Sequence, residues 1–410
     1  MNSCYQTTTH MNSILSDRVL QMEESATLAM AKKARELKAQ GIDIISLSLG
    51  EPDFKTPKHI QQAAKDAIDE GKYFAYPPVS GYQDLREAIA EKLREENNIQ
   101  EAKAEHIVVS VGAKHSIANT FMCILNEGDE VIIFSPYWVS YAEIIKLCGG
   151  VPVLIEGTLE NNFKASAAQL EAAMTSKTKA VIYSSPCNPT GSVFSQHELE
   201  AIANVVKKHE GVVVIADEIY ELINFTGKNF SIASLPGMFE RTVTVNGFSK
   251  GYAMTGWRVG YICAPLEVSK AVEKMQGQFT SGNTGIAQRA ALAGIAGDQG
   301  PSQEMAVQYL KRRDLVLGLL RDIPGIKTHV PEGAFYFFPD VTAFFGKSAH
   351  GHQVRNADDL CMYLLAIANV SLVTGSAFGA DNCVRISYAA SEADLIEAMK
   401  RMKKALGELA

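Results

Sequence analysis

Residues 212–220 read Val-Val-Val-Ile-Ala-Asp-Glu-Ile-Tyr, a short apolar run that ends in carboxylates and a phenol. The run 212–216 has the length of a buried strand and is much too short to cross a membrane. In parallel α/β sheets, ligands bind beyond the carboxyl ends of the strands. Asp217 is therefore expected at a binding site, where it can keep a ring nitrogen protonated while Tyr220 hydrogen-bonds a ring oxygen. The alternative is that Asp217 only caps the next helix.

Similar β-branched runs alternate with helical patterns on both sides of this stretch, which predicts an α/β fold with a mostly parallel sheet flanked by helices. The other expected strands are 107–111, 130–134, 151–155, 180–184, 242–245 and 259–263. Two helices have recognisable boundaries. Thr56-Pro57 starts the first, and Gly71 ends it. Ser195 with Glu198 forms a capping-box signature at the start of the second, and Gly211 marks its exit. We assign residues 56–295 to this large domain.

Fewer strands are expected after a helix over 303–320, namely 333–338, 370–373 and 383–388. A last helix over 391–406 has Ser391 as its cap, Asp394 in its first turn and Gly407 at its exit. This pattern predicts a smaller α+β domain over residues 296–410. Residues 1–55 are expected to form an N-terminal arm and part of the small domain.

The bulk composition excludes several classes of protein. The chain has 410 residues, 47% of them hydrophobic, and a formal net charge of -7 without a basic run, which argues against a nucleic-acid partner. Seven cysteines without CxxC spacing indicate reduced thiols and a cytoplasmic protein. The first 15 residues do not read as a secretory signal, and no run of 18 apolar residues indicates a membrane span. Nine histidines without metal-binding spacing predict no metal site.

Lys250 lies in the segment Phe248-Ser249-Lys250-Gly251-Tyr252-Ala253-Met254-Thr255-Gly256-Trp257-Arg258. A nucleophilic lysine needs desolvation or nearby positive charge to lower its pKa. Arg258 supplies a charge and a fork that suits phosphate. Because a continuous helix would place these two residues about 12 Å apart, we expect the glycines to fold the chain back. The alternative is an ordinary exposed lysine before a loop.

Two more loops follow expected strands and carry polar groups. Asn188 is fixed between two prolines in Ser185-Pro186-Cys187-Asn188-Pro189 and can serve a ring oxygen and a carboxylate, although it can also be a structural turn. Gly112-Ala113-Lys114 joins a strand to a helix, whose free N–H groups can bind phosphate. The segment lacks P-loop spacing, and the chain contains no GxGxxG, which argues against an NTPase and a dinucleotide dehydrogenase.

Two further side chains have the chemistry of ligand contacts. Trp138, in Pro136-Tyr137-Trp138, follows a strand and can stack on a flat cofactor, although tryptophan is more often a core or interface residue. Arg385 lies in the alternating strand Val384-Arg385-Ile386-Ser387 and can grip a carboxylate in bidentate fashion. The more common alternative for Arg385 is an exposed edge-strand residue.

Taken in order, these motifs resemble the class I aminotransferases, fold-type I enzymes that depend on pyridoxal 5′-phosphate (PLP). The resemblance runs from about residue 16 to 405 and includes Gly50-Glu51-Pro52-Asp53-Phe54, Tyr76 with Gly81, and the segments 112–114, 136–138, 188–191, 217–220 and 249–258, with Arg385. It implies the fold-type I architecture and a homodimer with active sites at the subunit interface. Some members carry a hydroxyl residue at the place of Gly247, so one phosphate contact is missing here.

The resemblance also implies a role for each matching residue. Lys250 would hold PLP as a Schiff base and move a proton between the substrate α-carbon and C4′, while Asp217 would bind the pyridinium nitrogen. Tyr220 and Asn188 would bond the phenolic oxygen, and Trp138 would stack on the ring. The phosphate would be bound by Ser249, Arg258, the backbone of Gly112, Ala113 and Lys114, and Tyr76 of the partner subunit. The substrate α-carboxylate would be held by Arg385, Asn188 and the Gly50 backbone.

The resemblance further suggests a substrate. In the most similar branch, a lysine at the place of Lys114 is associated with the distal carboxylate of aspartate or glutamate, and Thr27 resembles an N-terminal residue that assists from the other subunit. We therefore expect transamination between aspartate and 2-oxoglutarate by a ping-pong mechanism. Lys114 can instead only add charge near the phosphate. Open alternatives are an aromatic, kynurenine-type or broad aminotransferase, and a PLP-dependent β-lyase. A PLP-binding sensor domain would need a DNA-binding module, for which the N-terminus leaves no room.

Overall fold

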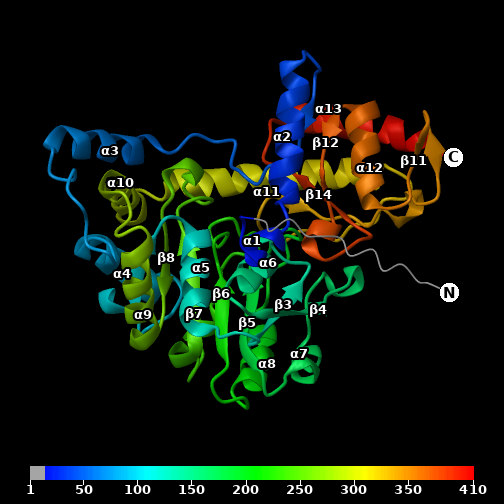
Figure 1. The fold of residues 1–410 in the computed structure, drawn as a ribbon. Helices are drawn as coiled ribbons and strands as arrows, with labels where there is room; N and C mark the ends of the chain where they lie inside the picture. The colour runs from blue at the N-terminus through cyan, green and yellow to red at the C-terminus, as the bar shows by residue number, and fades with distance from the viewer. Residues whose placement is uncertain (1–13) are drawn as a thin grey trace.

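A seven-stranded sheet forms the centre of the molecule, which a computed structural model describes over residues 14–410 (Figure 1). The strand order is β2-β8-β7-β6-β5-β3-β4. Strand β8 is antiparallel to both of its neighbours, and the other pairs are parallel. The strands are β2 (Ile107–Ser110), β3 (Glu130–Ser135), β4 (Val151–Glu156), β5 (Thr178–Ser184), β6 (Val213–Asp217), β7 (Thr242–Gly247) and β8 (Gly260–Cys263). The predicted α/β class and all seven predicted strands of this sheet are confirmed.

Helices cover both faces of the sheet because successive strand residues point to opposite sides. Val108 packs with α5 (Ala113–Ile124), α6 (Ser140–Leu147) and α9 (Leu266–Phe279) on one face. Val109 packs with α4 (Gln83–Glu96) and α10 (Gly285–Ala296) on the other face, where α3 (Lys58–Glu70) also lies. Further along this second face, α7 (Ala167–Ala173) and α8 (Gln196–Val206) cover β5 and β6. Both faces of the sheet are thus covered, except along the edge strand β4, where Val151 and Leu154 are exposed.

The predicted helix boundaries are confirmed in part. Ser195 accepts a hydrogen bond from the Glu198 N–H in a reciprocal capping box, and Gly71 ends α3 with φ of 68°. The N-cap of α3 is Pro57, however, and not Thr56, whose hydroxyl instead donates to the Ala253 carbonyl. Helix α8 ends at Val206, and a turn separates this end from Gly211, the predicted exit.

The C-terminal elements form smaller sheets with long helices packed on them (Figure 1). The three-stranded antiparallel sheet has the order β13 (Val373–Thr374), β14 (Val384–Ser387) and β9 (Tyr336–Phe337). The helices are α11 (Gly300–Arg321), α12 (Ala357–Tyr363) and α13 (Glu392–Gly407), and β10 (Ser348–Ala349) with β11 (His352–Gln353) is a peripheral hairpin. The predicted cap at Ser391 is confirmed, whereas α13 continues through Gly407. The predicted strands here are shorter than expected, and 370–373 divides into parts of β12 and β13.

The N-terminal segment packs against these C-terminal elements. It contains α1 (Asp17–Leu20), α2 (Ala26–Ala39) and β1 (Ile45–Ser46), and β1 pairs in parallel with β12 (Val370–Ser371). Ile45 and Leu47 are buried in the same hydrophobic core as α11, α12 and α13. Over residues 14–410, no helix has both the length and the apolar character that a membrane crossing requires. The six cysteines in this range are free thiols, and Cys4 lies outside the described residues.

Candidate active site

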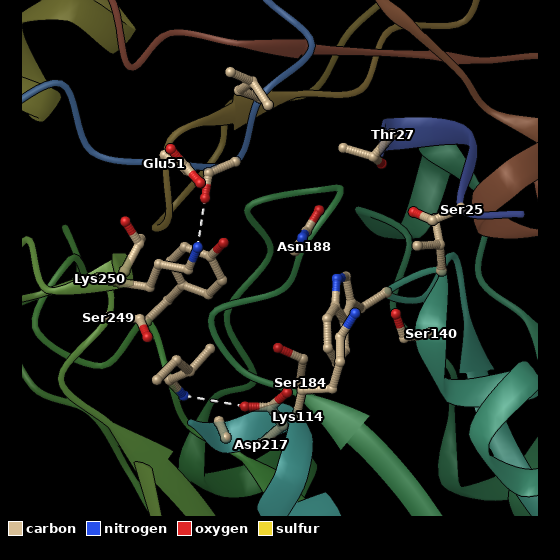
Figure 2. A pocket seen from close by; sticks show the side chains of 18 of the residues that line it. Ser25, Thr27, Glu51, Lys114, Ser140, Ser184, Asn188, Asp217, Ser249 and Lys250 are labelled. Carbon is tan, nitrogen blue, oxygen red and sulfur yellow. Dashed lines mark hydrogen bonds between the residues drawn. The ribbon is translucent and has the colours of Figure 1, made fainter. Parts of the chain in front are cut away.

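A cavity of about 530 Å³ opens at the carboxyl ends of the parallel strands (Figure 2). Strands β2, β3, β5, β6 and β7 run in the same direction, so the loops that follow them meet at one edge of the sheet. Strand β8 runs the opposite way, and its first residues therefore return to that edge. Of the predicted site residues, those that line the cavity are Thr27, Gly50, Ala113, Lys114, Trp138, Asn188, Asp217, Tyr220, Ser249, Lys250, Arg258 and Arg385.

Lys250 lines the cavity and is half-buried. Its Nζ donates to the Gly50 carbonyl and lies 5.6 Å from the centroid of the Tyr220 ring. Desolvation lowers the pKa of Lys250 to about 8, against an opposing effect of Glu51. The chain from Lys250 to Arg258 bends through a short 3-10 helix, and both residues line the same cavity, as predicted. A lysine with this pKa is a far better nucleophile near neutral pH than an exposed one.

Asp217 ends β6 and is held by two hydrogen bonds. Its Oδ2 accepts from the Tyr141 hydroxyl at 2.5 Å, and its Oδ1 accepts from the Ile219 N–H at 3.2 Å. Burial raises the pKa of Asp217 to about 6. Tyr141 was not predicted from the sequence; it lies in the first turn of α6, three residues after Trp138, which precedes the helix. The two rings meet edge to face with centroids 5.5 Å apart.

Tyr220 faces the cavity and is paired with a second tyrosine. Its hydroxyl and that of Tyr336 are 2.6 Å apart, and burial raises the pKa of Tyr220 well above its usual value. Tyr336, on β9, was also missed in the sequence. A Cβ at Gly50 would lie 2.5 Å from the Tyr336 hydroxyl, so only glycine fits there. The N-terminal segment and β9 therefore close one wall of the cavity together.

Arg385 is fully buried on β14 and has no carboxylate partner within residues 14–410. Its Nη1 donates to Asn188 Oδ1 at 2.9 Å, and its Nη2 donates to the Ser48 carbonyl at 2.6 Å. Its guanidinium lies between the rings of Tyr336 and Phe378, with centroids at 4.6 and 4.9 Å, while its buried Nε lacks a hydrogen-bond partner among the described residues. The alternative of an exposed edge-strand arginine is excluded. A buried cation without a counterion is strongly suited to an anionic ligand.

The start of α5 and Arg258 form an anion-binding corner. Gly112 precedes the helix with φ of 85°, and the Ala113 and Lys114 N–H groups have no acceptor in the described part of the chain. The Arg258 guanidinium covers Gly112 so closely that a Cβ there would lie 2.5 Å from Nη2. Ser249 also lines this side of the cavity. A Cβ at Gly247 would lie 2.8 Å from the Gly260 Cα, so the backbone leaves no space for a hydroxyl residue at that position.

The remaining predicted residues divide between the cavity and the surface. Lys114 Nζ lies 4.9 Å from the centroid of the Trp138 ring, and desolvation, with a smaller effect of Arg258, lowers the pKa of Lys114. Thr27 was expected to assist from another subunit, but here it lines the cavity of its own chain, opposite Lys250 (Figure 2). Tyr76 is 93% exposed and does not line this cavity. Within residues 14–410, no group of three or more His, Cys, Asp or Glu side chains is arranged to hold a metal ion.

The chain is similar to known proteins over almost its whole length. The family described as aminotransferase class I and II matches residues 42–402. A probable aspartate/prephenate aminotransferase of Rhizobium leguminosarum bv. phaseoli is 45% identical over 96% of this chain and 98% of its own length. An aspartate aminotransferase structure from Rhizobium meliloti has a TM-score of 0.93 at 40% identity and covers 97% and 99% of the two chains. One from Thermus thermophilus with maleate has a TM-score of 0.89 at 42% identity and covers 95% and 99%.

The chain belongs to the aminotransferase class I and II family, and its fold is fold type I. It is a PLP-dependent aminotransferase. The donor set of the cavity fits PLP. Free helix N–H groups with Arg258 suit a phosphate, a buried carboxylate at Asp217 suits a ring nitrogen, and a desolvated amine at Lys250 suits an aldehyde.

Proposed function

We propose that the enzyme transaminates L-aspartate with 2-oxoglutarate in two half-reactions. The observation that carries this proposal is the pair of cations that line a single cavity: Arg385, which donates to Asn188, and Lys114, which lies over the Trp138 ring. Two cationic anchors match the two carboxylates of aspartate, glutamate and their oxo acids. The relatives named aspartate aminotransferase support the same class of substrate, as does the Thermus thermophilus structure with maleate, a dicarboxylate.

In this proposal, the cavity holds the cofactor at three points. Arg258, Ser249 and the N–H groups of Ala113 and Lys114 bind the phosphate, whereas the Gly112 N–H, also predicted to do so, already donates to the Ser110 carbonyl at 2.8 Å. Asp217, oriented by Tyr141, bonds the ring nitrogen, while Tyr220 and Asn188 bond the phenolic oxygen. Trp138 covers the ring face. Arg385 and the Gly50 backbone, with Asn188, hold the substrate α-carboxylate.

Bound PLP supplies an electron sink conjugated to the α-carbon of the substrate. Lys250 would hold the cofactor aldehyde and would carry the proton between the substrate α-carbon and C4′. Its pKa of about 8 suits both directions of this transfer near neutral pH. Lys114 and Thr27 orient the distal carboxylate at the mouth of the cavity.

The assignment of Lys250 is tested by borohydride reduction of the holoenzyme followed by peptide mapping. We expect a single pyridoxyl label on Lys250. A label on any other lysine, Lys114 included, overturns the assignment.

The substrate is tested with a panel of aspartate, alanine, tyrosine, kynurenine and methionine as donors to 2-oxoglutarate. We expect aspartate to be preferred. Lys114→Ala should lower kcat/KM for aspartate by roughly tenfold to 100-fold, the range for a charged hydrogen bond, and should change alanine transfer much less. Lys164→Ala is a control, because Lys164 pairs with Glu198 outside the cavity. An equal loss for all donors refutes the distal-carboxylate role.

A second candidate acceptor is prephenate, which the name of the Rhizobium leguminosarum relative includes. Prephenate is a 2-oxo acid with a second carboxylate on a ring, so the same two cations could bind it. Rates with aspartate and either prephenate or 2-oxoglutarate decide between the acceptors. The same assays without an acceptor test the β-lyase alternative, because a lyase would release ammonia and pyruvate.

We further propose a cytoplasmic homodimer, with a large domain over residues 56–295 and a small domain formed by residues 296–410 and part of residues 1–55. Exposed Phe74, Tyr76 and Phe279, at 68%, 93% and 63%, support an interface near the Tyr76 loop. Light scattering on the holoenzyme should give twice the chain mass. Tyr76→Phe should weaken PLP binding if this side chain reaches the partner's phosphate.

A further inference from the structure

Asn283 is a buried residue in the turn before α10, and its amide connects two distant segments. The side chain is 1% exposed. Its Nδ2 donates to the Ser110 carbonyl at 2.9 Å and to the Arg258 carbonyl at 3.1 Å. Both amide hydrogens are therefore directed at backbone oxygens that lie almost 150 residues apart in sequence.

Those two carbonyls flank the proposed phosphate corner. Ser110 ends β2 two residues before Gly112, and Arg258 precedes β8 by two residues. The pairing of β2 with β8 ends at Ser110 and Gly260. Asn283 thus connects the two strands at the point where their own ladder stops. At the same place, the chain that leaves β2 continues into α5, and the chain that enters β8 carries the Arg258 guanidinium.

The amide is itself held in a single orientation. Asn283 Oδ1 accepts from the Thr284 N–H at 2.7 Å, and the Asn283 carbonyl accepts from Gln288 Nε2 at 2.7 Å. The first bond assigns the amide nitrogen to the side of the two carbonyls, and the second holds the Asn283 backbone in place.

The phosphate corner needs such support because its backbone is close-packed and strained. Arg258 has φ of 57°, a left-handed conformation that costs a non-glycine residue about 1 kcal/mol or more. Gly260 packs directly against the backbone of Gly112 and Ala113, with no space for a side chain. A small movement of the start of β8 would therefore displace both the guanidinium and the Ala113 N–H.

We propose that Asn283 is a positioning residue for the cofactor phosphate. By tying the Arg258 carbonyl to the end of β2, it fixes the guanidinium against the free N–H groups of α5. The inference rests on the proposed phosphate role of Arg258 and the start of α5. It assigns no contact between Asn283 and the phosphate itself.

The test compares two cofactor forms that differ only in the phosphate. The dissociation constants of PLP and pyridoxal are measured by absorbance titration of the apoenzyme, and their ratio reports the phosphate corner alone. Asn283→Ala should reduce the preference for PLP over pyridoxal by about tenfold, which corresponds to about 1.4 kcal/mol. Asn119→Ala is the matched control, because Asn119 is also 1% exposed but, within residues 14–410, its side chain donates to Gln276 Oε1 at 3.3 Å and to neither of these carbonyls.

A milder variant covers the case in which Asn283→Ala does not fold. Asn283→Ser keeps a short polar group that can reach only one of the two carbonyls, so we expect a loss of preference between those of the wild type and the alanine variant. Equal losses for PLP and pyridoxal in either variant, or the same loss of preference in Asn119→Ala, overturn the inference.

Arg258→Ala separates this inference from the proposed function. If that variant leaves the PLP preference unchanged, the phosphate site itself is misplaced. If Arg258→Ala removes the preference while the Asn283 variants retain it, only the positioning role of Asn283 is refuted.

Discussion

The segment from Asp217 to Glu221 has two buried sides with different chemistry. Asp217 and Tyr220 face the cavity with Lys250. Glu218 and Glu221 face α4, where Lys92 pairs with Glu221. Asn97, just beyond α4, accepts from Lys92 at 2.8 Å and donates to Glu221 Oε2 at 2.7 Å and Glu218 Oε2 at 3.2 Å.

The difference between the two sides lies in how the buried charges are satisfied. On the α4 side, Lys92 and Glu221 neutralise each other, with side chains only 6% exposed. On the cavity side, Lys250 forms no salt bridge among the described residues and bonds only a backbone carbonyl, and Arg385 likewise lacks a carboxylate. Because buried polar groups are normally paired, unpaired cations in a cavity mark the side that is built for a ligand.

The largest expected effect is on catalysis, from the cavity lysine. Lys250→Ala should lower kcat by at least about 10⁴-fold, since it removes both the covalent anchor and the proton carrier. The apoenzyme should keep or gain thermal stability, because a desolvated amine without a counterion is removed. Steady-state kinetics and thermal unfolding of the apoenzyme check both parts. A variant that retains a tenth of the activity would place the chemistry elsewhere.

The lysine on the α4 side should show the opposite behaviour. Lys92→Met leaves Glu221 buried without its partner, which should cost about 3–5 kcal/mol of unfolding free energy. The activity of the folded fraction should change little, because Lys92 does not line the cavity. Denaturant unfolding measures the loss. The double variant Lys92→Met with Glu221→Met should recover much of the stability, because both buried charges are then absent.

Asp217→Asn should separate activity from stability within the cavity. The neutral amide no longer stabilises a protonated ring nitrogen, so kcat should fall by roughly 10²–10³-fold, as for a lost preorganised electrostatic contact. Burial raises the pKa of Asp217 to about 6, so the folded apoenzyme is destabilised by the anion above that pH. The apo variant should therefore be more stable than the wild type at pH 7. Unchanged kcat, or lower apo stability, contradicts this account.

The sequence predicts the cavity side of this segment better than the α4 side. Asp217 follows a buried strand, and carboxyl ends of parallel strands converge, so its location at a site follows from the pattern alone. The same reasoning located Asn188, whereas Lys250 was located from its glycines and the nearby Arg258, and the alternation of β-branched runs with helical patterns predicted all seven strands of the large sheet. The antiparallel direction of β8 was not predicted, although that direction is what returns Arg258 to the cavity.

Residues that depend on tertiary packing were missed. Tyr141 reaches Asp217 because α6 packs on the large sheet, and Tyr336 reaches Tyr220 because β9 of the small sheet shares a core with the segment after β6. The partners Lys92 and Asn97 are more than 120 residues from the carboxylates that they bind. A single sequence specifies such contacts only through the complete fold, because no local period relates the partners.

Glu218 gives the smallest expected effect on activity and the most specific test of the comparison. Burial, with a smaller effect of Glu221, raises the pKa of Glu218 to about 8, so this carboxyl is protonated in the folded protein at neutral pH. The α4 side then contains one ionised carboxylate and one lysine. Glu218→Gln replaces a neutral acid by a neutral amide of the same shape, and kcat should stay within about twofold, because Glu218 does not line the cavity.

The pH dependence of stability should nevertheless change in this variant. Between about pH 4.5 and 8 the folded wild type holds a proton on Glu218 that the unfolded chain has lost, so its stability falls as the pH rises through this window. Each pKa unit corresponds to about 1.4 kcal/mol. Glu218→Gln lacks this dependence and should become progressively more stable than the wild type up to about pH 8, after which the difference should stay constant. Denaturant unfolding of the apo forms at pH 5, 6.5 and 8 measures the difference; parallel profiles would mean that Glu218 is ionised and that both sides of the segment contain buried anions.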